Sequence, residues 1–320
     1  MVEASASANK MRAGVSSVPM RAFLPLATFL MIGAASLPGT ARDRSEPSPR
    51  GRVRLTFSVE TANLVEVVAR AQARLDAFGV GGVVVSQRAD KLIVDVPAAQ
   101  AGISDDIKEL LCHPYELQFS IVENASAFMQ TLSVRSDNDP RARALGVSPS
   151  AEEWTVVSTN SVEHDAFLLG KRDALERYLS GLGPGNRPDR DHAIILGPVT
   201  DRPKLWRSHY VDLRTRIAIR RVDQASVRRD ETNGVELSMQ MLATDGDRIR
   251  ALTTANIGRK MAVAIDDEVI SVPVIEGAVG GKGRMTMSRE IQARRLAASL
   301  LAGPLLGRLT FVSPPKTRGP

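Results

Sequence analysis

Two hydrophobic periodicities alternate in a fixed order over residues 52–122, and this order restricts the folds open to the segment. Val53, Leu55 and Phe57 alternate as in a half-buried strand. Apolar residues spaced at three and four then predict an amphipathic helix that stops at Gly79: Leu64, Val67, Val68, Ala71, Leu75 and Phe78. Strands at 83–85 and 92–96, a short helix capped by Ser104, and a strand at 115–121 follow. The order β-α-β-β-α-β predicts a ferredoxin-like (split βαβ) base.

Regular patterns return after residue 206. Alternating apolar residues from Val235 to Met241 predict a strand, and Thr244 with Asp247 predicts a capping box at the start of a helix. A hairpin turn is expected at Asp266-Asp267, a second turn at 280–283, and a final helix capped by Ser288. These elements predict a second α+β subdomain, the head.

Residues 123–205 have no continuous pattern, because loop-like stretches at 136–140 and 181–191 interrupt them. We expect an irregular insertion or lobe. The predicted organisation is a signal peptide or N-terminal anchor (1–41), a linker (42–51), the base (52–122, with 306–314 as a candidate to complete it), the lobe (123–205), the head (206–305) and a tail (315–320).

The N-terminus has the pattern of an export signal. Lys10, Arg12 and Arg21 precede an apolar run at 22–38, and small residues at 39–41 follow it. The run is short for a spanning helix, so we favour a cleaved signal over an uncleaved anchor. We therefore expect a cell-envelope protein in the periplasm or at the outer face of the inner membrane. Membrane contact is expected only through this segment, if it stays uncleaved.

No arrangement of residues predicts chemistry. The four histidines are scattered, Cys112 is the one cysteine, and Asp266-Asp267-Glu268 is typical of a solvated turn. Gly280-Gly281-Lys282-Gly283 lacks the spacing of a phosphate-binding loop. We predict no catalytic residue, no cofactor and no metal site. The formal net charge of +6 is spread along the chain and aromatics make up 4% of it, which argues against nucleic acid as a partner.

Two blocks of sequence resemble the first periplasmic domain of SecD, the accessory subunit of the SecDF protein translocase. The first block comprises ARLDAFGV (73–80), KLIVDVP (91–97) and YELQFSIV (115–122). The second comprises LTTANIGRKMAVAIDDEVISVPVI (252–275), GAVGGKGRMTM (277–287) and SLLAGPLL (299–306). The second block is the more specific, because one long run agrees with the family in order and spacing.

The resemblance implies a set of positions that mark the fold: Asp76, Gly79, Pro97, Thr253, Asn256, Gly258, Asp266, Ser271, Pro273, Gly280 and Gly281. Three places depart from the family. Asp267 stands where the turn usually has Gly, Ala98 follows Pro97 where Gly is expected, and Gly303-Pro304 lacks two intervening residues. The resemblance does not reach the family's membrane helices, so it does not imply their proton-linked function.

The resemblance implies protein transport by non-covalent binding of unfolded or translocating polypeptide, along an edge strand or in an apolar cleft, without enzymatic activity. One alternative is a structural or regulatory partner that docks on a membrane-embedded subunit of the Sec translocase. Another is a degenerate SecD paralogue without activity.

Overall fold

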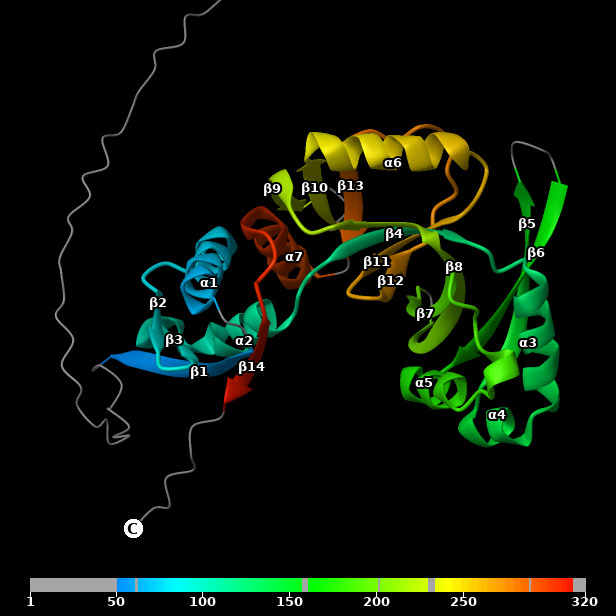
Figure 1. The fold of residues 1–320 in the computed structure, drawn as a ribbon, viewed down its shortest axis with the longest axis horizontal. Coiled ribbons are helices and arrows are strands. Elements are labelled where there is room, and N and C mark those ends of the chain that lie inside the picture. Colours follow the sequence, from blue (N-terminus) through cyan, green and yellow to red (C-terminus); the bar gives the residue numbers. More distant parts are fainter. Residues whose placement is uncertain are drawn as a thin grey trace, which may run out of the picture. The chain divides into compact units, whose positions relative to one another are not determined.

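The computed structural model describes residues 51–60, 63–156, 161–200, 202–229, 234–287 and 289–312 (Figure 1). The expected signal segment, most of the linker, Ser288 and the tail lie outside these residues. In the described part of the chain, no helix is both long and apolar enough to cross a membrane. The fold is α+β, as expected.

A four-stranded antiparallel sheet with the order β14-β1-β3-β2 forms the base. Its elements are β1 (Arg52–Glu60), α1 (Leu64–Phe78), β2 (Val84–Arg88), β3 (Lys91–Pro97), the 3-10 helix η1 (Ala98–Ile103), α2 (Ser104–Cys112) and β14 (Arg308–Val312). The core contains Phe57, Leu75 and Leu110, each fully buried. Asn63 caps α1 through the N–H of Glu66, and Gly79 ends the helix with a φ of 86°.

The strand expected to complete the base belongs to a different sheet, so that prediction was wrong. β4 (Leu117–Val122) pairs with β11 and β8, and all six of its residues are buried. A strand buried on both faces suits the interior of a large sheet better than the margin of a small one. β14 occupies the fourth place in the base, where Phe57 pairs with Phe311. The strand order is therefore that of a ferredoxin-like fold, closed by a strand from the far end of the chain.

The lobe is regular, in contrast to the irregular insertion expected for 123–205. Its helices are α3 (Ala127–Asn138), α4 (Pro140–Leu145), α5 (Arg172–Ser180) and the 3-10 helix η2 (Pro184–Asn186). Its strands are β5 (Ser148–Val156), β6 (Ser161–Gly170), β7 (His192–Val199) and the long β8 (Arg202–Ile219). With β4, β11 (Met261–Ile265) and β12 (Glu268–Ser271) they form a seven-stranded sheet of order β4-β11-β12-β7-β8-β6-β5.

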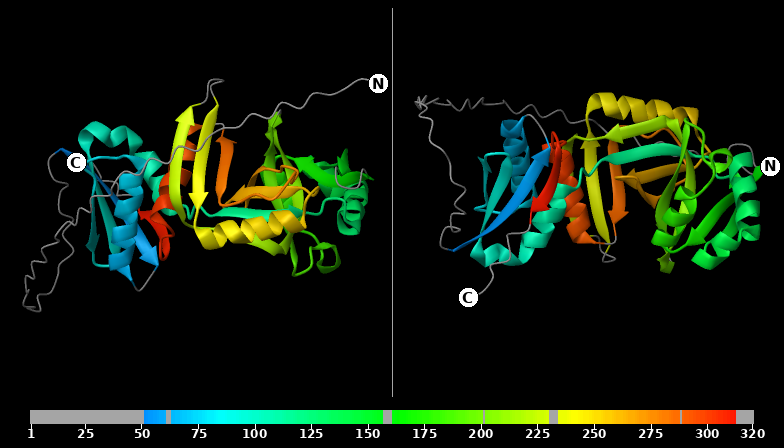
Figure 2. Two further views of the ribbon diagram at one scale, coloured as in Figure 1. Left: turned by 90° about the horizontal axis from the view of Figure 1, so that it is seen from above. Right: turned by 60° about the horizontal axis from the view of Figure 1, so that its bottom comes forward.

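The three-stranded sheet β13-β10-β9 carries the remaining strands. These are β9 (Val222–Arg229), β10 (Val235–Met241) and β13 (Lys282–Met287), accompanied by α6 (Ala243–Ala255) and α7 (Glu290–Ala302). The alternation predicted for β10 is confirmed, since Val235, Leu237, Met239 and Met241 are all buried. Figure 2 places β13, in orange, beside the β9–β10 hairpin.

Two predicted helix caps are wrong. Ser104 is the first residue of α2, and its hydroxyl donates to the carbonyl of Ala101 at 2.7 Å. α6 begins at Ala243, so Thr244 already lies inside the helix and no side chain caps its start. The predicted caps lie one residue after the N-cap Ile103 of α2 and two residues after the N-cap Leu242 of α6, a shift that sequence patterns seldom resolve.

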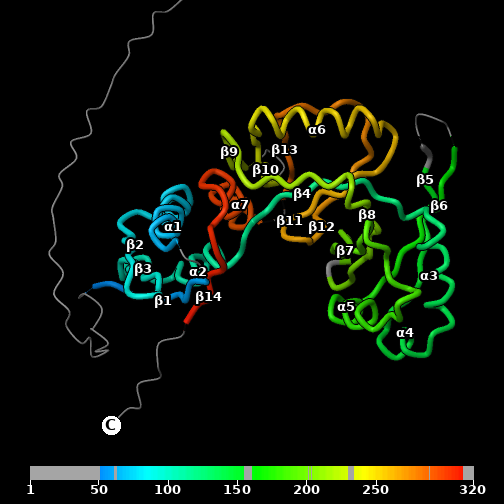
Figure 3. The backbone as a smooth tube through the Cα atoms, viewed as in Figure 1, coloured from blue at the N-terminus to red at the C-terminus, as the bar shows by residue number. Residues whose placement is uncertain are grey.

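α7 contributes to two cores. Leu296 and Leu300 pack with the three-stranded sheet, whereas Ala298 packs in the base. The tube in Figure 3 follows the chain out of α2 into β4, and back from α7 into β14. Arg74 of α1 touches both of these connections: its guanidinium donates to the carbonyls of Leu110, His113, Pro114 and Gly303.

Candidate functional site

The three-stranded sheet turns one polar face away from its core. Because side chains of a strand point alternately to opposite faces, burying Val235, Leu237 and Met239 turns their neighbours outward. Opposite pairs across the sheet share this face, since Ser238 lies opposite both Ser226 and Arg284. The polar face comprises Gln224, Ser226 and Arg228 of β9, Glu236, Ser238 and Gln240 of β10, and Lys282, Arg284 and Thr286 of β13.

Both margins of this sheet are open within the described residues, where β9 and β13 each pair with β10 alone. An edge strand presents a row of backbone N–H and C=O groups to which another extended chain can bond. The sheet can therefore accept a further strand.

Two adjoining hollows lie over this sheet. The larger, of about 800 Å³, is lined by residues of the polar face. The smaller, of about 510 Å³, reaches the first turn of α6 and is lined by Asp247, Arg250, Gly280 and Gly281 among others. Gln240 and Lys282 line both hollows, so the two lie next to each other.

Cations outnumber carboxylates on the polar face. Its charged residues are Arg228, Lys282 and Arg284 against Glu236 alone. Glu236 accepts a hydrogen bond from the hydroxyl of Ser238 at 2.7 Å and lies 3.9 Å from Arg284. Among the described residues, no ion pair engages Arg228 or Lys282. The face is therefore suited to acidic groups.

The family-motif positions of the head hold the segment that leads into β13. The buried Thr253 hydroxyl donates to the carbonyl of Ile249 and accepts the N–H of Val279, both at 2.9 Å. Gly258, with a φ of 86°, donates its N–H to the carbonyl of Ile275 at 2.8 Å. These bonds tie residues 275–279 to the C-terminal end of α6.

Four more motif positions lie before or after this segment in the same part of the head. Asn256 ends α6 and its side-chain amide donates to the carbonyl of Leu252. The Pro273 carbonyl accepts the N–H of Met261 at 2.9 Å, and that of Gly281 accepts the N–H of Met241 at 2.7 Å. A Cβ added to Gly280 would lie 3.2 Å from the guanidinium of Arg250. Gly280 and Gly281 are the only motif positions among the residues lining the larger or smaller hollow.

Asp266 and Ser271 belong to the β11–β12 hairpin. The Asp266 carboxylate accepts the N–H groups of Tyr115 and Glu116 at 3.1 and 2.7 Å, which joins the hairpin to the start of β4. Burial raises the pKa of Asp266 above its ordinary value, despite these two hydrogen bonds. Ser271 is exposed at the end of β12, opposite Val263.

The other motif positions lie in the base. The Asp76 carboxylate accepts a hydrogen bond from Gln72 at 2.8 Å, and its carbonyl accepts the N–H of Gly79. Pro97 ends β3 opposite Arg52. The structure thus does not bring the motif positions into one site.

Three of the five methionines of the head lie in its core. Met239, Met241 and Met261 are 4–6% exposed. Met285 and Met287 of β13 are half-buried and pack against the margin of the same core.

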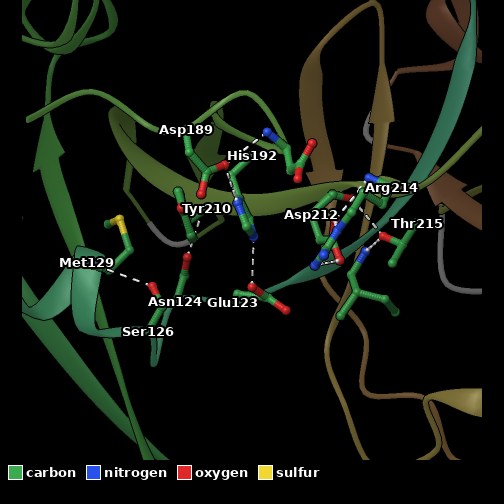
Figure 4. A network of polar contacts seen from close by, with 12 residues as sticks. Glu123, Asn124, Ser126, Met129, Asp189, His192, Tyr210, Asp212, Arg214 and Thr215 are labelled. Atoms are coloured by element: carbon green, nitrogen blue, oxygen red, sulfur yellow. Dashed lines mark hydrogen bonds and ion pairs between the residues drawn. The ribbon is translucent and has the colours of Figure 1, made fainter. Parts of the chain in front are cut away.

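A second polar centre, in the lobe, was not foreseen from the sequence (Figure 4). The ring of His192 lies 2.7 Å from an oxygen of Asp189 and 3.1 Å from one of Glu123, and it stacks on Tyr210. Burial alone would lower the pKa of His192, but its hydrogen bonds to the two carboxylates raise it above the ordinary value. Burial and nearby carboxylates raise the pKa of Tyr210 to about 12. The contacts of His192 join the segment after η2 to the end of β4.

The cysteine and the histidines considered in the sequence do not come together in one reactive site. Cys112 is partly buried, and burial raises the pKa of its thiol, which disfavours the nucleophilic thiolate. His113 pairs with Glu109 at 3.1 Å, on the same turn of chain. The buried His209 stays neutral, because burial lowers its pKa to about 3. Over the described ranges, no cluster of three or more His, Cys, Asp or Glu side chains could hold a metal ion.

Comparison with known proteins shows what this chain is similar to. Residues 201–306 match the family model described as SecDF, P1 head subdomain. This segment contains the three-stranded sheet, α6, and all of α7. The expected resemblance to the periplasmic domain of SecD and SecDF is therefore confirmed.

Individual proteins are similar to larger parts of the chain. The chain is 23% identical over 267 residues to protein translocase subunit SecD of Anaeromyxobacter dehalogenans (strain 2CP-C), covering 75% of this chain and 43% of the relative. It thus spans less than half the length of that curated relative. A crystal structure of SecDF in its super-membrane-facing form has the same fold, with a TM-score of 0.50 and 18% identity over 84% of this chain and 31% of that one. A structure titled for a membrane component SecDF that enhances protein export gives a TM-score of 0.48 at 18% identity, over 82% of this chain and 99% of that one.

Proposed function

We propose that this chain is an exported SecD-like periplasmic domain protein that assists protein translocation by binding polypeptide non-covalently. The observation that carries the proposal is that the segment matching the SecDF P1 head contains a sheet with two open margins within the described residues. The role needs no catalytic residue. The proposal includes the division into base, lobe and head, and a location in the periplasm or at the outer face of the inner membrane.

Strand addition suits a client that is not yet folded. An extended segment has unpaired backbone N–H and C=O groups, and an edge strand can pair with them whatever the side chains. Flanking side chains then set the preference among clients. The open margin of β13 lies next to the larger hollow, which Lys282 and Arg284 help to line.

Site-specific photo-crosslinking in the full-length chain tests the proposal. A photoreactive amino acid replaces Thr286 on the edge strand β13, and the control carries it at Val65 on the helix α1, which offers no strand margin. Both side chains are exposed. We expect adducts with a translocating precursor from position 286 and few from position 65.

The same experiment separates the two alternatives. A stoichiometric adduct with one membrane protein, independent of the precursor, would favour docking on a translocase subunit. No adduct above background at either position would contradict polypeptide binding through this sheet and favour a degenerate paralogue.

A further inference from the structure

We propose that β13 selects extended segments in which acidic and apolar residues alternate. This inference rests on the proposed function, since it specifies which polypeptides the open sheet prefers. It is carried by the alternation of β13 itself, KGRMTM, which has two cations on one face and two methionines on the other.

The geometry of a sheet fixes where the side chains of an added strand would lie. A new strand pairs about 4.8 Å from its neighbour, and opposite side chains on one face come within about 5 Å of each other. Successive side chains of the new strand would lie alternately beside the polar face and beside the core margin of β13. Its residues therefore meet two different surroundings in strict alternation.

On the polar face the new strand would meet Lys282 and Arg284. The two residues are two positions apart, so both lie on the same face of β13. Arg284 is 78% exposed on its side chain and has only the 3.9 Å contact with Glu236 as an ion pair among the described residues. Carboxylates at alternate positions of the client would lie opposite these two cations. Arg228, on the same face but on the opposite edge strand β9, adds to the positive field.

On the other face the new strand would meet Met285 and Met287. Both are half-buried and pack against the head core, which leaves part of each thioether side chain uncovered at the sheet margin. Methionine adapts its shape to varied apolar partners. The intervening client positions should therefore be apolar but otherwise variable.

The margin of β9 is less suited to this selection. Arg229 of β9 donates to the carboxylate of Glu290 on α7 at 2.9 Å, so an existing ion pair already engages this end of the strand. Its outward residues Gln224 and Ser226 are uncharged, and Arg228 is the single cation of its polar face. Of the two edge strands, β13 has two cations on its polar face and β9 has one.

Fluorescence anisotropy with three short, capped, labelled peptides tests the inference. The peptides alternate valine with glutamate, with lysine or with serine, and the protein is the full chain at low salt. We expect the glutamate peptide to bind about tenfold more tightly than the serine peptide, and the lysine peptide to bind more weakly than either. The preference should shrink at high salt, because exposed charge pairs are screened.

Charge reversal assigns the preference to β13. In the double variant Lys282→Glu, Arg284→Glu we expect the order of the glutamate and lysine peptides to invert. The matched control Lys91→Glu, Arg308→Glu makes the same change of charge at exposed positions of the base sheet and should leave the order unchanged. A glutamate peptide with methylated backbone nitrogens needs no protein variant and should bind at least tenfold more weakly, since it cannot pair as a strand.

The outcomes separate this inference from the proposed function. Equal binding of the three peptides, or equal effects of the two double variants, would overturn the selection by β13 and leave polypeptide binding standing. Undiminished binding of the methylated peptide would also overturn it. Failure of every peptide to bind would remove the proposed function as well.

Discussion

Replacing Arg74 with methionine removes the one side chain that bonds to both connections between the base and the rest of the described chain. Arg74 is fully buried. One terminal nitrogen donates to Leu110 and His113 at 3.0 and 2.9 Å, and the other donates to Pro114 and Gly303 at 3.0 and 3.3 Å. Burial lowers the pKa of Arg74 to about 10, so the guanidinium is still charged at neutral pH.

The cost of Arg74→Met follows from the four carbonyls that it deprives of a donor. The bonds to Leu110 and Gly303 are buried, and the loss of each costs about 1.5 kcal/mol. The bonds to His113 and Pro114 are part-buried, and the loss of each costs about 0.5 kcal/mol because water can replace the donor, so the four together cost about 4 kcal/mol. Burying a thioether in place of a cation returns about 1 kcal/mol. The net loss of unfolding free energy is therefore about 3 kcal/mol, which lowers Tm by about 6 °C in a domain of this size.

Thermal unfolding followed by circular dichroism measures this change, and Arg70→Met is the matched control. Arg70 lies one turn earlier on α1 and donates to the carbonyl of Ala302 at 2.7 Å, but it is partly exposed. Its loss should cost about 1 kcal/mol, because water can replace the donor. Hydrogen exchange should also speed up around residues 113–116 and 303–307 in Arg74→Met only.

Equal losses of Tm in the two variants would refute the reasoning, because they would mean that the four carbonyls do not depend on Arg74. Faster exchange spread evenly over the base, without a focus on the two connections, would also contradict it.

Two further predictions concern the lobe and the β11–β12 hairpin. The pKa of His192 is raised in the folded state by its bridge to Asp189 and Glu123. The bridge should therefore stabilise the fold fully at pH values below the pKa of His192 in the unfolded chain, and this stabilisation should disappear as pH rises through the pKa in the folded state. The free energy of unfolding measured with urea should thus fall by roughly 1 kcal/mol between pH 5 and pH 8, and this fall should be absent in His192→Gln. The same pH dependence in both proteins would contradict the prediction. Asp266→Gly should cost about 2 kcal/mol more than Asp267→Gly, because both positions have positive φ but only Asp266 holds two backbone N–H groups. Equal urea midpoints would argue against that role.

Several local elements follow from the sequence alone. The spacing of Leu64 to Phe78 and the glycine after it predict α1 and its end, since a left-handed residue there favours glycine. The alternation of Val235 to Met241 predicts β10 with its correct buried face. The turn at Asp266-Asp267 predicts the β11–β12 hairpin.

Only part of the candidate site could be predicted from the sequence. KGRMTM alternates polar and apolar residues, so its two faces could have been predicted from the sequence once it was recognised as a strand. That Lys282 and Arg284 share a face with Glu236 and Arg228 depends on register across three strands, which no local pattern encodes. The His192 centre joins residues 189 and 192 to residues 123 and 210, and these three parts of the chain are too far apart for any spacing rule.

The amino-acid sequence determined which segments become helices or strands and which side of each is apolar, because these properties arise from contacts within a few residues. The tertiary structure decided which strands pair with one another. Thr56 of β1 lies opposite Val312, at the far end of the described chain, whereas Leu117 of β4 lies opposite Ile219 in another sheet. Strand pairing is decided by burial and by the packing of distant segments, and only the folded chain brings those together.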